Sequence, residues 1–260
     1  MKYLVLLFVL INGNPSFSDT GPLSKKSLNY DIQWGHIVIG QITASLEKKY
    51  NGFILKLKSE SKGPLSLLYN YKSKLFASSF KEDGVWKAKT YITDSSVRNQ
   101  KYYSRVNWHR KDKKVDFQID PPLDLDKVYA VAHSTLENVI DPFTAILKVI
   151  EKVNNNKPCN SSVRIFDGRR RYNLSIKELE KKYLINDRPR SFMGNAVVCG
   201  IRVTPIGGHR IKSQWKPEID KFSDIKIFFG TVDEDTHLPV RMHLNRWFGE
   251  ITLRLLKSDY

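Results

Sequence analysis

The feature that most constrains this chain is an alternation of apolar and polar residues with a period of two. From Leu28 to Trp34 the apolar residues take every second position, and after Gly35 and His36 the alternation resumes from Val38 to Leu46. Successive side chains of a β-strand point to opposite faces, so such segments have one face toward a core and one toward water. The pattern predicts antiparallel strands.

Ten further segments are predicted as strands because they show similar alternation or runs of β-branched and aromatic residues. They are Phe53–Leu57, Leu75–Phe80, Val85–Ile92, Tyr102–Trp108, Val163–Phe166, Tyr172–Ile176, Ala196–Val203, Ile225–Phe229, Val240–Leu244 and Ile251–Leu255. Residues 177–194 are charged, and their pattern favours neither helix nor strand.

One segment is predicted to be helical. Asp141 and Pro142 supply an N-cap followed by proline at the first helical position, and apolar residues then recur at helical spacing from Phe143 to Ile150. A dozen strands and one helix indicate an all-β fold, in which a curved antiparallel sheet forms a barrel or half-barrel around the helix. No linker or repeat divides the chain, so residues 19–260 are predicted to form one domain.

The N-terminus predicts export. Lys2 precedes an unbroken apolar run from Tyr3 to Ile11, and the small residues Ser16 and Ser18 have the spacing that signal peptidase reads. Residues 1–18 are therefore expected to be a signal peptide cleaved after Ser18, which places the mature chain in the periplasm.

Cysteine usage agrees with an oxidising compartment. The chain has two cysteines, Cys159 and Cys199, which we expect to form one structural disulfide. On the chain-entropy model such a loop contributes about 4 kcal/mol to stability. The spacing fits neither a zinc site nor a redox-active C-x-x-C pair.

The formal net charge of +16 suggests a polyanionic partner or an anionic membrane surface. The basic residues are dispersed along the chain, so the charge also fits a general compositional bias toward lysine. Export argues against nucleic acid as the partner. Peripheral contact with an anionic membrane surface stays open.

Several motifs together resemble domain-of-unknown-function family 3108. They are the hairpin Tyr30–Gly35 with Val38–Gly40, Asp141-Pro142-Phe143, the arginine-rich hairpin at Asp167-Gly168, the pair Cys159 and Cys199, and the strand Leu238–Arg241. The resemblance covers nearly the whole mature chain. It implies an exported bacterial protein of predominantly β structure, and it carries no established reaction or catalytic residues.

Arg164, Arg169 and Arg171 are the candidate binding residues. Asp167-Gly168 predicts a two-residue type I′ turn that would set Arg164 opposite Arg171 and gather the three arginines on the outer face. Like charges directly opposite destabilise a sheet, so such a cluster would need an acidic neighbour or an anion. Glu178 or Glu180 could supply the acid, and phosphate or a lipid headgroup could supply the anion.

No catalytic residue, metal site or cofactor is predicted, because the histidines lack metal-ligand spacing and no nucleophile elbow or phosphate loop is present. The favoured function is a non-enzymatic periplasmic protein of the cell envelope that binds a lipid, an acyl chain or an apolar segment of a partner protein. One alternative is an envelope hydrolase acting on glycan or peptidoglycan. Another is a structural assembly factor without a small ligand.

Overall fold

The computed structural model describes residues 24–110, 114–212, 221–233, 236–246 and 249–257. The predicted signal peptide lies outside these residues. The described chain forms thirteen strands: β1 (Ser24–Trp34), β2 (Ile37–Lys49), β3 (Gly52–Ser61), β4 (Tyr71–Glu82), β5 (Val85–Val97), β6 (Gln100–Trp108), β7 (Val115–Asp120), β8 (Ser161–Phe166), β9 (Arg171–Leu184), β10 (Gly194–Gly207), β11 (Ile225–Asp233), β12 (Thr236–Arg246) and β13 (Gly249–Leu256).

The helical elements are α1 (Leu65–Leu68), the 3-10 turn η1 (His133–Leu136) and α2 (Pro142–Asn154). None of the described helices is long and apolar enough to cross a bilayer.

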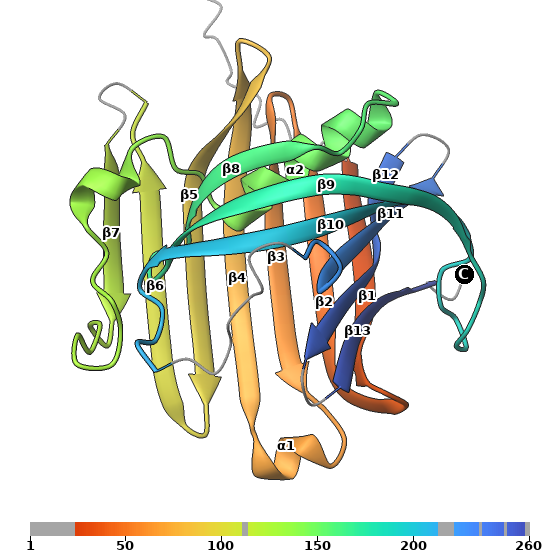
Figure 1. The fold of residues 1–260 in the computed structure, drawn as a ribbon, viewed down its shortest axis with the longest axis horizontal. Coiled ribbons are helices and arrows are strands. Elements are labelled where there is room, and N and C mark those ends of the chain that lie inside the picture. Colours follow the sequence, from red (N-terminus) through yellow and green to blue (C-terminus); the bar gives the residue numbers. More distant parts are fainter. Residues whose placement is uncertain (1–23, 111–113, 213–220, 234–235, 247–248, 258–260) are drawn as a thin grey trace, which may run out of the picture.

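The strands form a single antiparallel sheet that curves without closing. Its order is β7-β6-β5-β4-β3-β2-β1-β13-β12-β11-β10-β9-β8, so β7 and β8 are its two edges. In Figure 1 the strands β3 to β7 run side by side at the back, while β8, β9 and β10 cross in front of them. The predicted curved sheet around a helix is confirmed, and its form is an open one.

Helix α2 lies between the two crossing parts of the sheet and touches β4, β5, β8 and β12 (Figure 1). It begins as predicted: Asp141 caps it by accepting hydrogen bonds from the backbone N–H groups of Phe143 and Thr144. Phe143 and Leu147 pack with side chains of β4, β5 and β6. Val149 and Val153 pack with the disulfide and with β9 and β11. The helix is therefore apolar on more than one side, which is typical of a buried helix.

All twelve predicted strands are present, with longer bounds than predicted, and the ambiguous residues 177–184 complete β9. The strand β7 was not predicted. Val115, Phe117 and Ile119 do alternate with polar residues, but the run is six residues long and follows a basic stretch. A short edge strand pairs with only one neighbouring strand and has a short sequence pattern, which makes it hard to predict.

The free edge of β8 is covered by the residue that precedes the cap of α2. Ile140 pairs with Ile165 in a parallel bridge: its N–H donates to the carbonyl of Arg164 at 2.9 Å, and its carbonyl accepts from the N–H of Phe166 at 3.0 Å. This contact satisfies backbone groups that an exposed edge would present to another chain. It also fixes the start of α2 against the end of the sheet.

Candidate functional site

The arginine hairpin between β8 and β9 has a longer loop than predicted. Phe166 pairs with Arg171, and Asp167–Arg170 form a four-residue loop. The carboxylate of Asp167 accepts the N–H groups of Arg169 and Arg170 at 3.0 and 2.7 Å. This side-chain cap stabilises the wider turn, so the predicted two-residue turn is wrong.

The register therefore shifts by two residues, and Arg164 lies opposite Asn173 instead of Arg171. Because the shift is even, Ile165 still shares a face with Tyr172, as predicted. Phe166 and Arg171 share the other face, and both are buried.

The prediction that Arg164, Arg169 and Arg171 gather on an exposed outer face is wrong, because Arg171 is only 3% exposed. Arg164 and Arg171 both donate to the carbonyl of Thr135, at 2.9 and 2.8 Å. Arg171 also donates to the carbonyl of Tyr172. Burial and the nearby charge of Arg164 lower the pKa of Arg171. The two arginines thus hold η1 against the hairpin through carbonyl oxygens.

Arg169 points to a different place. Its guanidinium donates to the carbonyl of Pro121 at 2.7 Å, and it lies over the ring of Tyr102. The expected acids Glu178 and Glu180 form no ion pair with these arginines in the described part of the chain. Anion binding by Arg164, Arg169 and Arg171 stays a prediction, without the shared exposed surface on which it depended.

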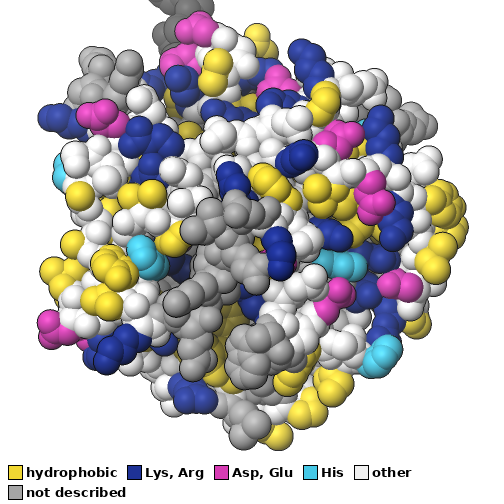
Figure 2. Space-filling model, in the orientation of Figure 1, with side chains coloured by type: hydrophobic (Ala, Val, Ile, Leu, Met, Phe, Trp, Pro, Cys, Tyr) yellow, Lys and Arg dark blue, Asp and Glu magenta, His cyan; other side chains and the backbone are white. Residues whose placement is uncertain are grey.

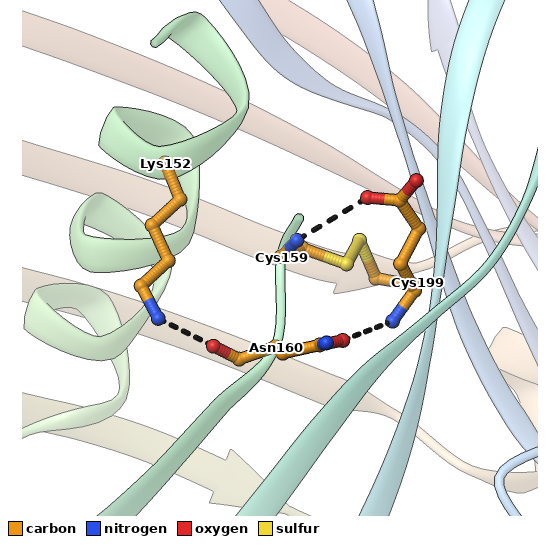
Figure 3. The surroundings of a disulfide bond; sticks show 5 residues. Lys152, Cys159, Asn160 and Cys199 are labelled. Carbon is orange, nitrogen blue, oxygen red and sulfur yellow. Dashed lines mark hydrogen bonds between the residues drawn. A yellow bond between two sulfur atoms is a disulfide. The ribbon is translucent and has the colours of Figure 1, made fainter. Parts of the chain in front are cut away.

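The disulfide between Cys159 and Cys199 connects the segment after α2 to β10, and both cysteines are fully buried. Figure 3 shows the hydrogen bonds around it. Glu178 accepts from the N–H of Cys159 at 3.4 Å and donates its own N–H to the side chain of Asn160 at 2.8 Å. Lys152 of α2 donates to the carbonyl of Asn160. The C-terminal end of α2 is thereby fixed to β9 and β10.

A groove of about 530 Å³ lies where β1, β11 and β13 meet residues 192 and 193. Its wall is a mixture of apolar and polar groups, and lysines contribute to it. The lining residues are Lys26, Ser27, Leu28, Asn29, Phe192, Met193, Thr231, Val232, Leu255, Leu256 and Lys257. No local sequence pattern predicts this groove, because its walls come from three strands and a loop that are far apart in the chain.

One wall of the groove belongs to a strap, residues 185–193, which connects β9 to β10. Ser191 pairs with Leu256, and the N–H of Phe192 donates to the carbonyl of Leu255. The carbonyl of Arg190 accepts the N–H of Lys257 at 2.7 Å. The strap thus lies beside β13 and sets Phe192 and Met193 against the groove.

Asp187 anchors the strap to the sheet. Its carboxylate accepts hydrogen bonds from Arg241 at 2.8 Å and from Arg254 at 2.9 Å, and these arginines lie opposite each other on β12 and β13. Arg254 also donates to Gln33 at 2.7 Å. Burial alone would raise the pKa of Asp187, but the hydrogen bond from Arg254 and the two arginine charges outweigh it and lower the pKa. The negative charge of Asp187 offsets part of the repulsion between the two arginines.

The described residues contain no group of three or more His, Cys, Asp or Glu side chains placed to hold a metal ion. His237 lies against Asn154, and His243 lies 3.5 Å from Glu250. These two histidines thus have separate local partners.

Two comparisons place the chain among known proteins. A solved structure from Brucella abortus, described as a beta-barrel-like protein of domain of unknown function DUF1849, superimposes with a TM-score of 0.52 at 11% identity. The match covers 93% of this chain and all of that one, and at this identity it shows a shared fold. No curated protein matches the sequence. The model of the family described as "Protein of unknown function (DUF3108)" matches residues 29–256, so the chain belongs to that family.

Proposed function

We propose that this protein is a non-enzymatic component of the cell envelope that binds an acyl chain, or a similar apolar segment, in the groove beside β13. The observation that carries the proposal is the groove itself. Its volume of about 530 Å³ is in the range of small-molecule sites, and Leu28, Phe192, Val232 and Leu255 supply the apolar part of its lining.

The charged part of the lining favours an amphiphile over a wholly apolar ligand. Lys26 and Lys257 are among the lining residues, at the start of β1 and just after β13. An aliphatic chain would remove water from the apolar wall, while an anionic end would meet the ammonium group of Lys257. The concave face of the sheet is covered by α2, so the proposed ligand lies in this groove and not at the centre of the sheet.

The periplasmic assignment belongs to the same proposal. It is supported by the predicted signal peptide and by the buried disulfide, a bond that persists in oxidising compartments.

The test is native mass spectrometry of the mature protein after mild purification, followed by titration of the delipidated protein with a fluorescent fatty acid. We expect a co-purified lipid and saturable binding of the probe. Met193→Gln with Val232→Gln should raise the dissociation constant at least fivefold, because both side chains line the groove.

Val85→Gln with Ile211→Gln is the matched control, since these exposed apolar residues lie outside the groove. The control should bind the probe like the wild type. Equal loss of binding in both double variants, or no binding by the wild type, would overturn the proposal.

A further inference from the structure

A second hollow lies on the outer face of the sheet, on the side opposite α2. On β3 to β6, the side chains that face α2 belong to the same hydrophobic cluster as Phe143. They include Leu55, Ala77, Tyr91 and Val106. The residues between them point away from the helix, because side chains alternate along a strand. Over β2 to β6 this outer face forms a hollow of about 420 Å³.

The register of the sheet brings four lysines into this hollow. One row across the strands consists of Thr43, Lys58, Lys74, Asp94 and Tyr103, and the next consists of Gln41, Glu60, Lys72, Ser96 and Lys101. Lys58 and Lys74 are directly opposite each other. Like charges in this position destabilise a sheet unless an anion lies between them.

The acids of the hollow neutralise only part of this charge. Glu60 forms an ion pair with Lys62 at 2.5 Å, and Lys62 does not line the hollow. The hydrogen bond from Lys62, and then the charges of Lys62 and Lys72, lower the pKa of Glu60, so it is ionised and already paired. Asp94 is left to face Lys74. Four lysines against Glu60 and Asp94 leave the hollow with a net positive charge.

On the face that carries β8, β9 and β10, the Lys and Arg side chains are spread out among other residues (Figure 2). On the outer face of β2 to β6 they line one depression together with hydroxyl and amide groups.

We propose that this hollow binds a phosphate ester. Lysines from β3, β4 and β6 line it, and ammonium groups suit the several acceptor oxygens and the double charge of a phosphate group. The hollow is more than ten times larger than the share of one water molecule in the liquid, about 30 Å³. It therefore has room for the esterified group as well as the phosphate. The site is separate from the apolar groove and does not depend on its ligand.

The test compares two probes of the same chemistry: glycerol 3-phosphate in solution, and phosphatidylcholine vesicles containing phosphatidylglycerol. Lys58→Gln with Lys74→Gln should raise the dissociation constant at least fivefold. Lys87→Gln with Lys89→Gln is the control, because it removes the same charge from exposed residues of β5 that do not line the hollow. The control should change binding less than twofold.

Selective loss with glycerol 3-phosphate identifies a soluble ester as the ligand, and selective loss with vesicles alone identifies a lipid headgroup. An equal loss of affinity in the two double variants, or no binding of either probe by the wild type, would contradict the proposed phosphate-ester site. Asp94→Asn gives a second measurement that does not depend on the lysine variants folding. Removing the acid opposite Lys74 should tighten binding at least twofold, and unchanged or weaker binding would contradict the proposal.

Discussion

The rings of Phe117 on β7 and Phe166 at the end of β8 lie edge to face, with centroids 5.0 Å apart and planes at 80°. These strands are the two edges of the thirteen-stranded sheet. Ser104 of β6 donates to the carbonyl of Asp167 at 3.2 Å beside them. The ends of the open sheet therefore meet through side chains of the β8–β9 hairpin, where a closed barrel would have a ladder of backbone hydrogen bonds.

Phe166→Ala should separate these ends. The side chain is fully buried, so we expect the free energy of unfolding to fall by about 3–5 kcal/mol. Phe117→Ala is the comparison, because this residue is 39% exposed and its removal should cost less than half as much. Urea unfolding of both variants measures the difference. An equal fall in the free energy of unfolding in both variants would show that the buried ring of Phe166 does not hold the two edges of the sheet together.

Asp141→Asn should remove a pH dependence of stability. Burial raises the pKa of Asp141 from 3.8 to about 6, so the native state binds this proton more tightly than the unfolded chain does. This group therefore stabilises the fold fully below pH 3.8, and its contribution of about 3 kcal/mol is lost as the pH rises to 6.

The asparagine should keep the hydrogen bonds from Phe143 and Thr144, and the variant should be at least as stable as the wild type at pH 7. Unfolding measured between pH 4 and 7 checks the slope. Asp141→Ala is the control that removes the cap, and it should cost at least about 1 kcal/mol. A slope unchanged in Asp141→Asn would assign the pH dependence to other groups.

Asp187→Asn should loosen the strap. Arg241 and Arg254 would lose the carboxylate that they share, and stability should fall by about 1–2 kcal/mol, less than for a fully buried pair because the Asp187 side chain is 31% exposed. Since the pKa of Asp187 is lowered, its contribution is present above pH 3.8 and is lost as the pH falls through the lower folded value.

Asp124→Asn is the control for this variant, because the ion pair of Asp124 is with the exposed Lys127 three residues away, and its carboxylate also accepts the nearby N–H of Asp126. Thermal unfolding at pH 7 should separate the two, with no measurable change in the control. A strap that stayed equally protected from amide hydrogen exchange in Asp187→Asn would contradict the anchoring role.

The disulfide should be complete in the exported protein. Its intact mass should be two hydrogens below that of the reduced form, with no free thiol. Replacing Cys159 and Cys199 with alanine should lower stability by about 4 kcal/mol on the chain-entropy model. Two reactive thiols in protein taken from the periplasm would contradict the pairing.

Maturation is open to a direct measurement. Protein isolated from the periplasm should begin at Asp19, as N-terminal sequencing would show. Replacing Ser16 and Ser18 with arginine should block cleavage, because the peptidase accepts small residues at these positions. A full-length chain retained in the cytoplasm of the wild type would overturn the predicted export.

The strands, the helix and its cap were determined by the sequence, because alternation and capping are local properties. The alternation from Leu28 to Trp34 and the N-cap at Asp141 depend on neighbouring residues in the chain. The family could also be predicted from the sequence, because most of its motifs are short local stretches.

The order of the strands and the position of the sites were decided only by the tertiary structure. Pairing of β1 with β13 joins residues near opposite ends of the chain, and no local pattern records such a contact. The β8–β9 hairpin also depended on contacts that a local pattern does not record. The side chain of Asp167 stabilises a four-residue loop by accepting two backbone N–H groups. Arg171 is buried where it donates a hydrogen bond to the carbonyl of Thr135. The lysines of the outer hollow are ordinary strand residues in sequence, and the register of β3 to β6 places them on one face of the sheet.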